Sequence, residues 1–324
     1  MKFGGKVIAL VFDIDNWAKD IEVNNLNYPS IREINDVVYD PSNPDVCVAD
    51  LLYNPHSTKY DKYPVILNIH GGGWVIGDKR NSRGQCLQMA DSGWFVVNMN
   101  YGLPPKEYKM FEKHDPKKSH GDYYYPTQVQ MAYKALQWIA DNAAKYNLDT
   151  DCVVVSGDSA GSHLASVVVT SSANPEVRKG LGVSDPAVKV KGGILFSGFY
   201  DLTYFWGADI MKVPWFRELA KAIFNTDDIH HHPAYPYFNP IPFVTPEQPK
   251  TLVVYGNKDP ITHGHSPKLR DRLKEVGADY EYYEETGPVA LHDFHLLSFL
   301  PSSHNCMQYV AGFLDRVAPP HKKT

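Results

Sequence analysis

The segment GDSAGSHLA contains a serine in the pattern Gly-x-Ser-x-Gly, formed by Gly157, Ser159 and Gly161. The apolar run CVVVSG at 152–157 leads into it and predicts a buried strand. Between a strand and a helix, this pattern holds the serine on a sharp turn at the carboxyl end of the strand, and the glycines leave room for the tight backbone. The pattern therefore predicts that Ser159 is a nucleophile.

A serine hydroxyl is a weak nucleophile at neutral pH, so a histidine must take its proton and a carboxylate must orient that histidine. Asp259 comes just after the apolar run TLVVYGN, and His292 lies in the segment LHDF after the next predicted strand. They give the chain order Ser, Asp, His that accompanies this type of turn. Asp201 and Asp293 are competing carboxylates, and His295 is a competing base.

Three consecutive glycines separate an apolar run from a tryptophan in HGGGW at 70–74. Glycine lacks side-chain packing and adds entropy to the unfolded chain, so three together indicate that a ligand or a developing charge approaches the main chain. Attack on an ester carbonyl creates an oxyanion, which backbone N–H groups can stabilise. We expect the N–H groups of Gly72, Gly73 and Ala160 to form this oxyanion hole.

The pattern of apolar side chains predicts the elements that must position these residues. Continuous apolar runs, typical of strands buried on both faces of a parallel sheet, lie at 64–71, 94–101, 152–157, 192–201 and 251–259. Further strands are expected at 46–54 and 279–285, and helices at 125–146, 266–276 and 302–316. Strands alternating with helices in this order indicate an α/β fold with right-handed crossovers.

Three stretches do not follow this alternation. Residues 1–45 are rich in Asn, Asp and Pro and are interpreted as a partly helical arm. Residues 202–240 are too long for a simple connection and are interpreted as an inserted helical lid. Residues 104–122 form a Lys-rich loop in which acidic residues alternate with the lysines, so a solvated surface is favoured over a site for anionic substrates.

The motifs HGGGW (70–74), GDSAG (157–161), GNKDP (256–260) and HDF (292–294) together resemble the hormone-sensitive-lipase-like branch of the α/β-hydrolase serine esterases. Four motifs in one order are far more specific than any one of them. The resemblance extends over roughly residues 46–316 and implies an α/β-hydrolase fold, with a mostly parallel eight-stranded sheet flanked by helices under a helical cap.

By this resemblance, the cap comprises an N-terminal arm at 1–45 and an insertion at 202–240. The hydrolase core then comprises a first part at 46–201 and a second part at 241–324. The sequence departs from the family after the strand expected at 94–101, where it reads YGLPPKEYKM instead of a short segment of the type YRLAPE. The substrate preference of the family is therefore the least transferable property.

The resemblance assigns the nucleophile, acid and base to Ser159, Asp259 and His292, and the oxyanion donors to Gly72, Gly73 and Ala160. It implies that His70 orients the glycine loop. Asp158 is interpreted as a structural partner within the serine turn.

Aromatic residues are candidates for lining an acyl or alcohol pocket, with packing as the equally weighted alternative. Trp74 is nearest to the chemistry in the sequence and is assigned to substrate binding. The other candidates are Trp206, Trp215 and the run Tyr123–Tyr125.

Composition restricts the remaining functional classes. The 324 residues carry a net charge of −5, which gives no basic surface for nucleic acid. The four cysteines are scattered without a Cys-x-x-Cys pair, and the histidines of DDIHHHP (227–233) are interpreted as exposed and not as metal ligands. No cofactor or metal is expected. Apolar runs are too short for a membrane span, a cytoplasmic protein is the default, and a homodimer is compatible with the sequence.

The sequence therefore predicts a serine carboxylesterase that hydrolyses short- to medium-chain carboxylic esters through an acyl-enzyme on Ser159. One alternative keeps the same triad but cleaves an arylformamide or another amide. A second alternative is a ligand-binding hydrolase homologue without turnover, which is disfavoured because the serine and the histidine are both present.

Overall fold

The computed structural model describes residues 26, 28–105, 119–202 and 214–320, with residues 214 and 215 described as backbone only. The expected arm up to residue 25, most of the Lys-rich loop, Trp206 and the side chain of Trp215 lie outside this part of the chain.

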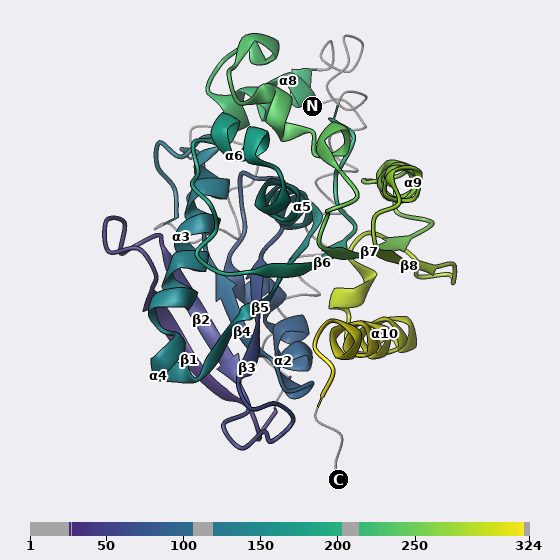
Figure 1. The fold of residues 1–324 in the computed structure, drawn as a ribbon. Coiled ribbons are helices and arrows are strands. Elements are labelled where there is room, and N and C mark those ends of the chain that lie inside the picture. Colours follow the sequence, from purple (N-terminus) through teal and green to yellow (C-terminus); the bar gives the residue numbers. More distant parts are fainter. Residues whose placement is uncertain (1–25, 27, 106–118, 203–213, 321–324) are drawn as a thin grey trace.

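The described strands form one eight-stranded sheet in the order β1-β2-β4-β3-β5-β6-β7-β8 (Figure 1). They are β1 (Arg32–Val38), β2 (Val48–Tyr53), β3 (Tyr63–Ile69), β4 (Phe95–Met99), β5 (Leu148–Asp158), β6 (Val190–Phe196), β7 (Lys250–Gly256) and β8 (Tyr280–Glu285). Two pairs, β1 with β2 and β2 with β4, are antiparallel, and the other five pairs are parallel. The expected α/β-hydrolase fold with a mostly parallel sheet is confirmed.

Helices cover both faces of this sheet, with α3 and α5 on one face and α2 and α10 on the other (Figure 1). The helices are α2 (Arg83–Asp91), α3 (Thr127–Asp141), α4 (Ala143–Tyr146), α5 (Ser159–Ala173), α6 (Pro175–Leu181), α8 (Pro214–Phe224), α9 (His265–Val276) and α10 (Pro301–Val317). In β3, Val65 and Leu67 pack in the cluster that includes α3 and α5, whereas Ile66 packs with α2 and α10. Burial on both faces explains why the strand sequences are continuously apolar.

The first strand corrects one expectation from the sequence. Residues 32–38 fall within the arm assigned to 1–45, but they form β1 at the edge of the sheet, paired with β2. The strand reads REINDVV, and its register shifts between Ile34 and Val37, with Asp36 at a φ of 56°. Because this bulge breaks the alternation of apolar and polar residues, the pattern gives no clear strand signal.

The described part of the insertion at 202–240 is helical, as expected. It contains α8 and the short 3₁₀ turns η3 (Ile229–His231) and η4 (Tyr235–Phe238). This segment lies beyond the carboxyl end of β5, next to α6 (Figure 1). It joins the core where Tyr125 N donates to Ile223 O at 2.8 Å and the Tyr125 hydroxyl donates to Tyr237 O at 2.8 Å.

Candidate active site

Ser159 lies at the junction of β5 and α5, as the first residue of the helix. Its φ of 52° is in the left-handed region, which a residue with a side chain adopts only where its surroundings enforce it. A Cβ on Gly161 would lie 2.1 Å from the carbonyl oxygen of Ile69, and a Cβ on Gly157 would lie 2.5 Å from the backbone of Gly161. The two glycines of the motif therefore allow the helix to pack directly on β3.

The side chains of Ser159, His292 and Asp259 form a chain of hydrogen bonds. His292 Nε2 is 2.9 Å from Ser159 Oγ, and His292 Nδ1 is 2.8 Å from Asp259 Oδ2. Because the carboxylate can only accept, Nδ1 carries the proton and Nε2 is left to accept the serine proton. This is the arrangement that activates a serine by general base catalysis.

The loop after β7 holds Asp259 in its ionised form. Its carboxylate accepts hydrogen bonds from Ile261 N at 2.7 Å, from Thr262 N at 3.0 Å and from the Thr262 hydroxyl. Burial alone would raise the pKa of Asp259, but the neighbouring His292 and these hydrogen bonds hold its pKa below the ordinary value. A buried negative charge therefore faces the imidazole.

The competing residues make other contacts. Asp201 pairs with Lys268 Nζ at 2.6 Å. Asp293 Oδ2 is 3.4 Å from His292 Nε2, on the opposite side of the ring from the Nδ1 partner. The His295 ring is buried and stacks on Phe196 at 4.0 Å. Among Asp201, Asp293 and Asp259, it is Asp259 that accepts the hydrogen bond from His292 Nδ1.

The glycine loop has an unusual backbone over three consecutive residues. Gly72, Gly73 and Trp74 have φ angles of 120°, 58° and 65°. A Cβ on Gly72 would lie 2.0 Å from Ile76 O, whereas a Cβ on Gly73 would have no described atom within 4 Å. The first glycine is required by the turn itself, and the second borders open space in the described part of the chain, where a substrate can approach.

The start of the loop is tied to the nucleophile turn. Asp158, which precedes the nucleophile, accepts from Gly71 N at 3.1 Å and from the Ser82 hydroxyl at 2.9 Å. The His70 ring donates from Nδ1 to Gly71 O at 2.7 Å and stacks on Tyr101 at 4.2 Å. These contacts agree with the structural roles expected for Asp158 and His70.

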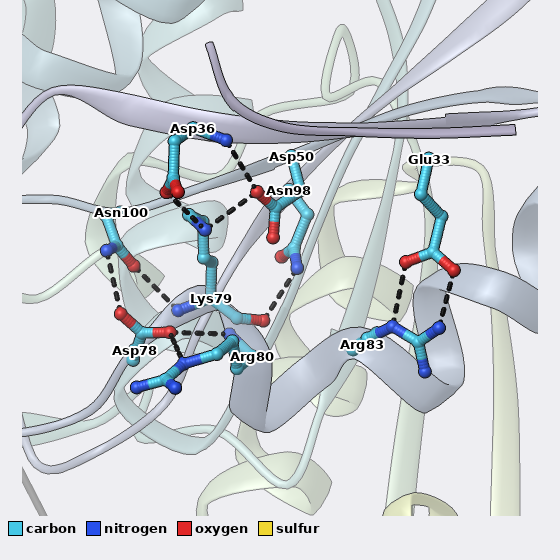
Figure 2. Close-up of polar contacts among 9 residues, drawn as sticks. All are labelled: Glu33, Asp36, Asp50, Asp78, Lys79, Arg80, Arg83, Asn98 and Asn100. Carbon is cyan, nitrogen blue, oxygen red and sulfur yellow. Dashed lines mark hydrogen bonds and ion pairs between the residues drawn. The ribbon is translucent and has the colours of Figure 1, made fainter. Parts of the chain in front are cut away.

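A polar network around the buried side chain of Lys79 follows the glycine loop, and no sequence motif pointed to it. Figure 2 shows Lys79 Nζ between Asp50 Oδ1 at 2.7 Å and Asp36 Oδ1 at 3.0 Å. The backbone of the same lysine is held by Asn100, which accepts from its N–H at 2.6 Å, and by Asn98, which donates to its carbonyl at 2.6 Å (Figure 2). The available signal was the two asparagines in the otherwise apolar run WFVVNMNY.

Trp74 is packed inside the protein. Its side chain is 2% exposed, and its ring lies 5.2 Å from Phe199 and 5.5 Å from Phe238. The indole Nε1 donates to His163 Nδ1 at 2.9 Å. The side chain of Trp74 therefore packs in the core, which is the second of the two interpretations drawn from the sequence. Tyr125 is likewise buried, next to Phe238 at 4.6 Å.

Neither the cysteines nor the histidine cluster forms a second reactive centre among the described residues. In the cluster at 227–233, His231 is paired with Asp228 at 2.8 Å, and the described residues contain no group of three His, Cys, Asp or Glu side chains suited to a metal ion. All four cysteines are buried, and burial raises the pKa of the Cys47 and Cys152 thiols to about 11. Such thiols are poor nucleophiles at neutral pH.

Of the described helices, none is both long and apolar enough to cross a membrane.

Comparison with known proteins places this geometry in context. The family model BD-FAE matches residues 50–273. The esterase LipQ of Mycobacterium tuberculosis is 26% identical over 272 residues, 83% of this chain and 59% of LipQ. Bovine (Bos taurus) arylacetamide deacetylase is 28% identical over 173 residues, 51% of this chain and 35% of that protein.

A similar solved structure is that of esterase B from Lactobacillus rhamnosis inhibited by a tributyrin phosphonate. Its TM-score is 0.77, with 20% identity over 98% of this chain and 96% of the esterase. At this identity the likeness concerns the fold. The chain spans about 59% of the length of LipQ, the curated relative quoted above.

Proposed function

The chain belongs to the BD-FAE family, and on that premise we propose that it is a serine carboxylic ester hydrolase. The observation that carries the proposal is the chain of hydrogen bonds from Ser159 Oγ through His292 to Asp259, at 2.9 and 2.8 Å. The named esterase LipQ among its relatives supports the same activity.

In the proposed acylation step, Ser159 Oγ attacks the ester carbonyl carbon while His292 Nε2 takes its proton. The negative charge that develops on the carbonyl oxygen is stabilised by the N–H groups of Gly72, Gly73 and Ala160. His292 then gives the proton to the leaving alcohol, the carbon–oxygen bond of the ester breaks, and the acyl group stays on the serine. Asp259 stabilises the imidazolium throughout.

Deacylation repeats the sequence with water as the nucleophile. His292 Nε2 takes a proton from water, and the resulting hydroxyl attacks the acyl carbon. The proton returns to Ser159 Oγ as the carboxylic acid leaves, so the enzyme is regenerated without a cofactor. Trp74, which is buried, is proposed to form part of the wall behind the acyl site and not a direct contact.

The proposed substrate is a small-molecule ester with a short to medium acyl chain. An amide hydrolase is a second candidate, because arylacetamide deacetylase is among the similar proteins. A cytoplasmic location and a homodimer stay predictions from the sequence.

The test is hydrolysis of p-nitrophenyl esters from acetate to palmitate, with formanilide as the amide probe, by the wild type and by Ser159→Ala. We expect turnover that peaks at short chains and falls by about 10⁴-fold or more in the variant. Faster cleavage of formanilide than of any ester would replace the ester assignment with the amide assignment. Equal rates in the two proteins would exclude Ser159 as the nucleophile.

A further inference from the structure

His163 is a fully buried side chain on α5, one helical turn after the nucleophile. The triad does not use it. The residue lies where three segments meet: the helix that begins at Ser159, the glycine loop, and the η4 turn of the inserted segment. A polar ring in such a place must find partners for both of its nitrogens.

Its two hydrogen bonds define one tautomer. The indole N–H of Trp74 can only donate, so His163 Nδ1 is the acceptor of the 2.9 Å bond. The proton is then on Nε2, which donates to the carbonyl oxygen of Phe238 at 2.7 Å. Burial lowers the pKa of His163 to about 3, so this neutral form persists at neutral pH.

The bond to Trp74 complements the anchor at the start of the loop. Gly71 N donates to Asp158, the residue before Ser159, and Trp74 Nε1 donates to His163, four residues after Ser159. Gly72 and Gly73, two of the three expected oxyanion donors, lie between these anchors in the sequence. Since Gly72, Gly73 and Trp74 all have left-handed φ angles, no regular secondary structure fixes this part of the loop.

We propose that His163 is a positioning residue which, together with Asp158, fixes the N–H groups of Gly72 and Gly73 relative to Ser159. This inference rests on the proposed esterase function and adds a specific residue to its machinery. Donors placed before the reaction need no reorganisation as the oxyanion forms, so a shift of the loop lowers kcat more than it raises KM.

Two substitutions separate the two hydrogen bonds of the ring. His163→Asn offers an amide oxygen near the position of Nδ1, so it keeps an acceptor for Trp74. His163→Gln offers an amide N–H near the position of Nε2, so it keeps a donor for Phe238. We expect His163→Gln to lower kcat by about 10- to 100-fold with KM changed by less than about threefold, and His163→Asn to retain most of kcat.

Trp74→Phe removes the donor and keeps an aromatic ring. If the hydrogen bond between Trp74 and His163 positions the loop, Trp74→Phe and His163→Gln lower kcat to a similar extent, and the double variant has no lower kcat than either single variant. Leu314→Ala is the control for lost stability, because Leu314 is buried in the cluster on the opposite face of the sheet. This variant should unfold more easily and keep the wild-type kcat.

A measurement without substrate tests the contact itself. The ¹⁵N-indole spectrum of the protein reports its tryptophans, and the loss of one signal in Trp74→Phe identifies the Trp74 resonance. This resonance should move upfield in His163→Gln and stay close to its position in His163→Asn.

The outcomes distinguish a failure of the proposed esterase function from a failure of the positioning role of His163. An inactive wild type overturns the proposed function and this inference with it. An active wild type with equal kcat in His163→Asn and His163→Gln, or a Trp74 resonance that does not respond to His163→Gln, overturns the inference alone.

Discussion

Two buried histidines near the active site accept hydrogen bonds through an unprotonated Nδ1. His163 accepts from Trp74, and His265 accepts from the backbone N–H groups of Tyr200 and Asp201 at 3.2 and 3.1 Å. Burial lowers the pKa of His163 to about 3 and that of His265 to about 4. At the residue scale, the fold therefore depends on imidazoles that stay neutral in mildly acidic solution.

This property predicts a pH dependence of stability. In the unfolded chain each histidine titrates at about 6.5, so below that pH the unfolded state binds protons that the folded state does not bind. The free energy of unfolding then falls as the pH decreases from about 6.5, by up to about 1.4 kcal/mol per pH unit for each histidine. Between pH 7 and pH 5, urea denaturation should show a loss of about 4 kcal/mol from the two together.

Substitutions test whether the buried histidines cause this loss of stability. His265→Gln should reduce the loss between pH 7 and pH 5 by about 2 kcal/mol, because glutamine does not titrate. His304→Gln is the matched control, since this exposed residue on α10 should leave the pH dependence unchanged. An identical loss in all three proteins would contradict the explanation.

At the element scale, the start of the η1 turn (Lys79–Ser82) is tied to three strands by one lysine. The Lys79 side chain is 6% exposed and pairs with Asp36 of β1 and Asp50 of β2, while its backbone is held by Asn98 of β4 and by Asn100 (Figure 2). Burial would lower the pKa of Lys79, but the two carboxylates hold its pKa above the ordinary value. The segment that follows the glycine loop is therefore fixed to the antiparallel edge of the sheet.

Lys79→Met should destabilise the protein by about 3 to 5 kcal/mol, because it leaves the buried carboxylate of Asp50 without a counter-charge. The double variant with Asp50→Asn should recover part of this loss. Lys268→Met is the matched control: the Lys268–Asp201 pair has a similar distance, but the lysine is 49% exposed, so the loss should be at most about 1 kcal/mol. Equal losses on urea denaturation would show that burial of the pair does not matter.

At the scale of the whole molecule, the parallel part of the sheet could be predicted because its strands are buried on both faces. Continuous apolar runs as short as PVILNIH favour a buried strand over a helix. The edge strand β1 could not be predicted in this way, since its bulge at Asp36 breaks the alternation.

The proposed triad could be predicted from the sequence because Ser159 directly follows β5, Asp259 and His292 lie in the connections after β7 and β8, and parallel strands end at one edge of the sheet. The residues that support the triad could not be predicted in this way. Asp36, Asp50 and Lys79 come together through the strand order, and His163 belongs to no motif. Contacts of this kind depend on tertiary structure and leave little trace in local spacing.

In the proposed mechanism, Ser159 carries the acyl group. The most direct test of this role is the mass of the intact protein after reaction with diethyl p-nitrophenyl phosphate, which transfers a diethylphosphoryl group to an activated serine and releases p-nitrophenol. We expect one added group per chain, located by peptide mapping on Ser159 and absent from Ser159→Ala. A group on another residue, or an unmodified wild-type protein, would contradict this mechanism.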